Sequence, residues 1–157
     1  MQPNIVFNAQ QVKALESALS RQLEKAKRIG GLTLEHEAEV IMSRSWEQIP
    51  VETGAAMSTG FVKPSKDDNG DPTVKIGYEA GPGDINPKTG RPVEDYLYPL
   101  HEDLDRYHAR GKAKFLEDPL LAYIPTLRTR LTNIIQYQMK YNVSPAGLFT
   151  TISSGGD

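Results

Sequence analysis

The spacing of apolar residues changes twice along this chain, and this change restricts the fold more than any other sequence feature. Over residues 12–26, apolar side chains recur every three or four positions, which is the period of an amphipathic helix. In residues 73–80, "TVKIGYEA", they alternate with other residues, as in a half-buried strand. After residue 118 the helical spacing returns. The pattern predicts an α+β domain with helices on one face of a small antiparallel sheet.

The first helix is predicted to begin at Asn8, because Asn8 and Gln11 have the spacing of a capping box. We expect it to end at the two glycines of residues 30–31, since glycine is a poor helix former. Thr33 then caps a second helix, which Pro50 ends. The apolar stripe of the first helix consists of Val12, Leu15, Leu19, Leu23 and Ala26.

The middle of the chain predicts a hairpin followed by a long loop. Two strand-like segments flank the turn residues 67–72, "DDNGDP", which favour a hairpin connection. Residues 80–95 contain three prolines and three glycines with few apolar residues, so an irregular loop is expected there. Residues 96–100, "YLYPL", are predicted to form a short third strand, with Pro99 favouring a sheet edge.

A last helix is predicted from Asp118 and Pro119, which suit a helix cap and first turn. Pro125 is expected to bend or delay this helix. We expect the first and last helices to pack together on one face of the sheet, with Leu19 and Leu131 in the core. The apolar positions of the last helix are Leu121, Ile124, Leu127, Leu131, Ile134 and Met139.

Length and composition indicate one domain over residues 1–157. The proportions of hydrophobic and charged residues, 38% and 24%, are close to globular averages. Residues 143–157 are small and polar, which predicts a flexible tail.

Gly54 follows the helix that Pro50 ends. We expect a tight turn at Gly54, in which a side chain would clash with its surroundings.

The overall composition argues against several classes of function. The absence of cysteine excludes disulfides and thiol catalysis and fits assembly in a reducing cytoplasm. The 18 basic and 20 acidic side chains nearly cancel, so no general attraction to nucleic acid or to an anionic membrane is expected. Neither a signal peptide nor an apolar run of membrane-spanning length is recognisable, so secretion and membrane insertion are not expected.

Residues 100–120 have the highest density of ionisable groups and are the candidate for catalysis. His101 and His108 are seven positions apart, which is not the one-turn spacing of two zinc ligands on a helix. Glu102 and Asp105 could act as acid and base, although charges this dense usually form a solvated or salt-bridged face. We therefore expect no metal and no cofactor. A metal-dependent or acid–base enzyme using His101, Glu102 and His108 is the alternative hypothesis.

Two further groups of charged residues are candidates for contacts with other molecules. Nearby acids weaken a basic run beside Tyr107 and Phe115, so passive contact with DNA is expected rather than specific binding. Its members are Arg106, Arg110, Lys112 and Lys114. The long loop is expected to be mobile in the monomer and to contact a neighbouring subunit in an assembly. Its mixed-sign candidates are Asp84, Lys88, Arg91, Glu94 and Asp95.

Three segments occur in a characteristic order: "WEQIPVETGAAMSTGF", "VKIGYE" and "YLYPLHEDLDRYHARGKAKFLEDPL", followed by an amphipathic helix. This order resembles the head–tail joining and tail-completion proteins of long-tailed double-stranded DNA phages, also described as neck or minor capsid proteins. In that family two helices end at a Pro-x-x-Thr-Gly step, which Pro50, Thr53 and Gly54 match. The resemblance covers about residues 10–140 and departs at Pro99 and in the long loop. Later matching positions are Tyr98, Leu100, His101, Glu102, Gly111, Phe115, Leu116 and Pro119.

The resemblance implies a structural virion protein and no catalysis. It implies a ring, expected to be a hexamer, that joins or completes the tail at the head–tail interface and lets DNA pass through its lumen. Its partners would be further copies of itself and the adjacent connector and tail-tube proteins. The ring would be assembled in the host cytoplasm. Tail terminator, tail completion protein and connector component all stay open. Implied contact residues outside the loop are His101, Glu102, Arg110, Lys112 and Lys114.

Overall fold

The computed structural model describes residues 8–143, and it begins with one long helix, α1 (Ala9–Gln48). The predicted capping box is confirmed, because the Asn8 side chain accepts a hydrogen bond from the Gln11 amide at 2.8 Å and the Gln11 side chain accepts one from the Asn8 amide at 3.0 Å. Beyond Val143, the predicted flexible tail lies outside the described residues.

The two glycines of residues 30–31 lie inside α1, so the prediction of two N-terminal helices is wrong. Both glycines are places where another element approaches the helix. A Cβ atom on Gly31 would lie 3.1 Å from Cβ of Pro72, and one on Gly30 would lie 3.6 Å from Cδ1 of Ile135. Packing on two sides therefore offsets the poor helix propensity of glycine, which is about 1 kcal/mol per residue.

A β-hairpin follows α1 after the single-turn 3-10 helix η1 (Met57–Thr59). Strands β1 (Gly60–Lys66) and β2 (Pro72–Tyr78) pair antiparallel, with Gly60 opposite Tyr78 and Val62 opposite Ile76. The predicted hairpin and its turn are thus confirmed. Within residues 8–143 the sheet contains these two strands only.

The predicted third strand is wrong, because these residues belong to helix α2 (Glu94–Glu102). Val93 and Leu100 are buried, and Tyr96 and Leu97 pack against the same core cluster. This spacing of three and four residues places one face of a helix in the core. Glu94 and Asp95 in the first turn also stabilise the helix, because their negative charges interact favourably with the N-terminal end of the helix dipole. The loop predicted over residues 80–95 therefore ends at residue 93, immediately before α2 begins.

The last helix, α3 (Glu117–Tyr141), begins without a side-chain cap at Leu116, so the prediction that Asp118 caps it is wrong. Asp118 lies instead in the first turn, and the helix continues through Pro125. The helix is followed by its C-cap residue Asn142, which has a left-handed backbone conformation with φ of 53°.

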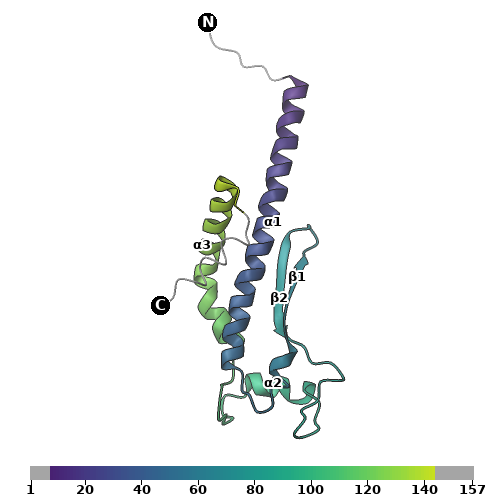
Figure 1. Cartoon of the computed structure of the whole chain (residues 1–157), viewed down its shortest axis with the longest axis vertical. Helices are drawn as coiled ribbons and strands as arrows, with labels where there is room; N and C mark the ends of the chain where they lie inside the picture. Colours follow the sequence, from purple (N-terminus) through teal and green to yellow (C-terminus); the bar gives the residue numbers. More distant parts are fainter. Residues whose placement is uncertain (1–7, 144–157) are drawn as a thin grey trace.

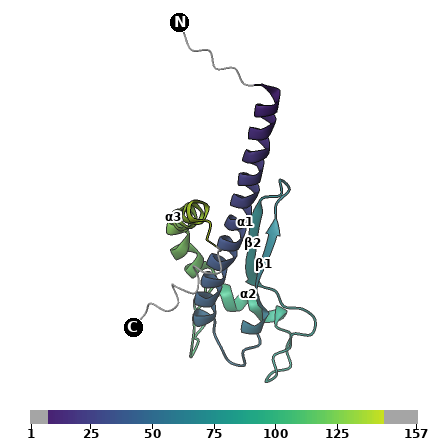
Figure 2. The ribbon, with the colours of Figure 1, turned by 45° about the horizontal axis from the view of Figure 1, so that its top comes forward.

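Helix α1 is the central element, with α3 on one side and the hairpin on another (Figures 1 and 2). The α+β class is confirmed and the first and last helices pack together, but α1 is the helix that covers the hairpin. The expected core position of Leu19 is wrong because its side chain is exposed, whereas Leu131 is half-buried. The main core cluster lies near the lower end of α1 and consists of Ile49, Ala56, Val93, Leu100 and Phe115.

Candidate functional site

The segment between α2 and α3 folds back against the C-terminal end of α1. The Lys112 amide donates a hydrogen bond to the Gln48 carbonyl at 2.9 Å. Gly111 has φ of 83°, and a Cβ atom there would lie 2.6 Å from the Gln48 oxygen and the Pro50 nitrogen. Only glycine fits this close approach. The charged stretch is therefore anchored by its backbone to the end of the longest helix.

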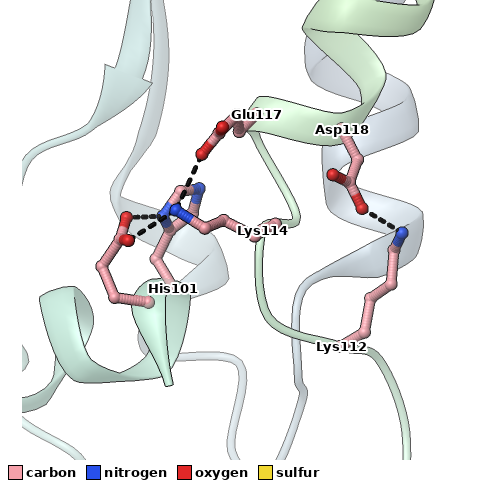
Figure 3. Close-up of polar contacts among 6 residues, drawn as sticks. His101, Lys112, Lys114, Glu117 and Asp118 are labelled. Atoms are coloured by element: carbon pink, nitrogen blue, oxygen red, sulfur yellow. Dashed lines mark hydrogen bonds and ion pairs between the residues drawn. The ribbon is translucent and has the colours of Figure 1, made fainter. Parts of the chain in front are cut away.

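Four side chains of this stretch form a network that we call the polar clamp: His101, Glu102, Lys114 and Glu117. The ammonium group of Lys114 lies 2.5 Å from Oε2 of Glu102 and 2.8 Å from Oε2 of Glu117. Nδ1 of His101 lies 2.6 Å from the other oxygen of Glu102. Figure 3 shows Lys114 beside His101 and reaching toward Glu117 at the start of α3. The clamp joins the end of α2 to the beginning of α3.

The electrostatics of the clamp favour the charged forms of Glu102 and Lys114. The hydrogen bond from Lys114, followed by that from His101, lowers the pKa of Glu102. The hydrogen bonds from Lys114 to Glu102 and Glu117 raise the pKa of Lys114. A general acid or base at neutral pH needs a pKa shifted toward neutrality, and these shifts go the other way. The arrangement therefore suits a structural link between two helices.

The two histidines of the alternative hypothesis lie in different surroundings. The His101 ring packs edge-on against Phe115, with 4.8 Å between ring centroids. His108 lines a hollow beside the residues that follow α1, whereas His101 lines another hollow with Tyr78 and Leu97. Within residues 8–143, no three or more histidine, aspartate or glutamate side chains are grouped to hold a metal ion.

The run of four basic residues is divided by the fold. Lys112 pairs with Asp118, and Lys114 belongs to the polar clamp, so both lysines have acidic partners. Arg106 and Arg110 instead line a hollow of about 420 Å³ together with Arg91, which comes from the long loop. We call this the arginine hollow. Its other lining residues are Asn86, Thr89, Tyr96, Leu100, residues 50–56 and residues 107–109.

Of the remaining candidates of the long loop, Asp84 and Lys88 have partners within the chain. The Asp84 side chain accepts a hydrogen bond from the Gly81 amide at 2.7 Å, which closes a turn. Lys88 lies 2.6 Å from a carboxylate oxygen of Glu52, at the edge of the arginine hollow. Glu94 and Asp95 lie in the first turn of α2. The expected ordering of the loop upon assembly stays a prediction.

The turn predicted at Gly54 is confirmed in its backbone, with φ of 80°. The expected steric clash is wrong, because no atom lies within 4 Å of a Cβ built at this position. Glycine is favoured there by conformation alone.

Sequence reasoning missed that Arg91 joins Arg106 and Arg110. The sequence does contain a signal for this grouping. Lys112 and Lys114 each have an acidic residue three to six positions later with which to pair, so the arginines are the basic residues left to bind elsewhere.

No family model, curated protein or solved structure matches the chain. None of the helices in residues 8–143 combines the length and the apolar character needed to cross a bilayer.

Proposed function

We propose that this chain is a structural subunit of a phage neck, forming a ring that joins or completes the tail and lets DNA pass through its lumen. The observation that carries the proposal is a bare apolar stripe on the N-terminal part of α1. Its side chains are exposed to 44%, 58%, 61% and 55% of their full areas, for Val12, Leu15, Leu19 and Leu23 respectively.

The bare stripe continues the face of α1 that α3 covers. Leu23, Gly30 and Glu37 follow one another at intervals of seven residues, or about two helical turns. Gly30 faces Ile135, and Glu37 lies 2.8 Å from the guanidinium of Arg130. The same face is therefore buried by α3 in one half of the helix and uncovered in the other.

An uncovered helix of this kind suits a subunit rather than a monomer. The N-terminal part of α1 extends beyond both α3 and the hairpin, as Figures 1 and 2 show. A single helix of this length is marginal in water, and contiguous apolar surface usually marks an interaction site. A neighbouring copy would supply the missing cover, and contacts between two different surfaces close into a ring when the rotation permits.

The remaining structural features are consistent with a passive role. The polar clamp and the close contact of Gly111 hold α2, α3 and the C-terminal end of α1 together. This part of the subunit is therefore fixed by contacts within the chain. The resemblance supplies the expectation of a hexamer, with the adjacent connector and tail-tube proteins as further partners. Virion localisation belongs to the same proposal.

The proposal is tested by measuring the mass of the purified protein with light scattering and imaging it by negative-stain electron microscopy. We expect rings with a central opening for the wild type and monomers for Leu19→Asp. Ser17→Asp is the matched control, because Ser17 is exposed on the opposite side of the same helix and receives the same charge change.

A wild-type protein that stays monomeric over the whole accessible concentration range would contradict the proposal. Metal analysis of the same sample separates it from the enzymatic alternative. Stoichiometric zinc or manganese bound through His101, Glu102 or His108 would favour an enzyme.

A further inference from the structure

We infer that the arginine hollow receives the acidic hairpin turn of a second copy of this chain. The turn comprises residues 67–71, "DDNGD", and Asp68 is the side chain that would enter the hollow. The inference rests on the proposed function, since it names a contact through which neighbouring ring subunits would hold each other.

The hollow presents three cationic side chains without acidic partners. Arg91, Arg106 and Arg110 form no ion pair with another residue of the described range 8–143, although each is exposed at the hollow. Nε2 of His108 is buried there and has no hydrogen-bond partner. Glu52, the acid in the lining, is already paired with Lys88. Guanidinium groups bind carboxylates through paired hydrogen bonds, so the hollow is suited to a carboxylate ligand.

The hairpin turn has the complementary charge and a fixed conformation. One carboxylate oxygen of Asp67 accepts hydrogen bonds from the amides of Asn69 at 2.9 Å and Asp71 at 2.8 Å. Asp71 also pairs with Lys27 of α1 at 2.7 Å. Asp68 is exposed and bonds to no other described residue. A turn that is already ordered loses little conformational entropy when it binds.

The geometry requires that the turn come from another molecule. The turn lies at the far end of the hairpin, whereas the hollow lies where α1, α2 and the 103–116 segment meet (Figure 1). β1 has seven residues and therefore spans about 23 Å between these regions. Turn and hollow are different surfaces of one chain, so their pairing is a heterologous contact, the type that generates rings.

Charge exchange tests this contact. We expect Arg110→Glu and Asp68→Arg each to weaken self-association of the full chain by on the order of tenfold or more, measured by sedimentation equilibrium. The double variant, which exchanges the two charges, should regain most of the wild-type association. Arg21→Glu is the matched control, because Arg21 is exposed on α1 and far from the hollow, and it should associate like the wild type. Circular dichroism of each variant checks that the monomer is folded.

Several outcomes would overturn the inference. Single variants that associate like the wild type, or a double variant that stays as weak as the singles, would exclude the turn as the occupant. A loss confined to binding of a short DNA duplex, with self-association unchanged in Arg110→Glu, would make the hollow a phosphate site instead. In these cases wild-type rings would still support the proposed function. A wild type that never self-associates would remove both proposals.

Discussion

The two ends of α1 have the same helical periodicity of apolar residues and opposite surroundings. At the N-terminal end, every residue from 9 to 24 except the half-buried Ala18 is exposed. At the C-terminal end, Met42, Ser45 and Ile49 are completely buried between the other elements. Periodicity therefore identifies which face of a helix is apolar, but not whether the same chain covers it. Other elements of the same chain bury the C-terminal end of α1. We propose that a neighbouring copy of the chain buries the apolar stripe at its N-terminal end.

The largest effect is expected where the covered end of α1 meets the 103–116 segment. In Gly111→Ala, the new Cβ would overlap backbone atoms of residues 48–50, in a conformation with φ of 83°. We expect a loss of about 4 kcal/mol or more in the free energy of unfolding, measured by urea denaturation. An unchanged denaturation midpoint would show that the segment does not hold this end of the helix.

A truncation in the covered half should be the next most destabilising. Met42 is completely buried and lies against the start of β1. Met42→Ala should cost about 2–5 kcal/mol of unfolding free energy, because it removes buried methylene groups and leaves a cavity. A cost below 1 kcal/mol, on the scale of surface substitutions, would mean that the two ends of α1 differ less than their burial indicates.

The boundary between the two ends can be probed at Gly30, where α3 approaches α1. A Cβ atom there would make only ordinary contact with Ile135, at 3.6 Å. Gly30→Ala should therefore stabilise the protein by about 0.5–1 kcal/mol, because alanine is the better helix former. Gly31→Ala is the comparison, and it should gain less, since its Cβ would lie 3.1 Å from Pro72. Destabilisation by Gly30→Ala would support the helix break predicted from the sequence.

A smaller, pH-dependent effect is expected at the polar clamp, near the covered end. The pKa of Glu102 is lowered in the folded protein from its ordinary value of 4.5. Its contribution to stability is therefore present above about pH 4.5 and is lost as the pH falls through the lower, folded-state pKa. Glu102→Gln should lower the melting temperature at pH 7 and converge with the wild type on acidification. A constant difference across this range would assign the effect to packing.

The smallest effect on the monomer is expected in the uncovered half. Leu19→Ala should change the unfolding free energy by no more than about 0.5 kcal/mol at concentrations where the protein is monomeric, because the side chain is mostly exposed. The same variant should weaken self-association if a neighbour covers the stripe. A large loss of monomer stability would show that Leu19 is buried within its own chain.

Residues close in sequence determined the elements that could be predicted. The start of α1 depends on hydrogen bonds between Asn8 and Gln11, which lie three residues apart. The hairpin follows from its turn residues and the alternation of β2, and the Asp67 side chain stabilises the turn through amides two and four residues away. Such interactions form within one short segment, so the sequence by itself was sufficient to predict them.

The tertiary structure decided the features that depend on distant contacts. Gly30 and Gly31 stay helical because α3 and β2 pack against them, and residues 94–102 form a helix because Val93 and Leu100 reach the core formed with Phe115. Arg91 meets Arg106 and Arg110 only through the path of the long loop. Local propensities differ by about 1 kcal/mol, whereas burial of one large apolar side chain contributes about 1.5–3 kcal/mol. Burial therefore outweighs local preference, and it depends on which remote segments meet.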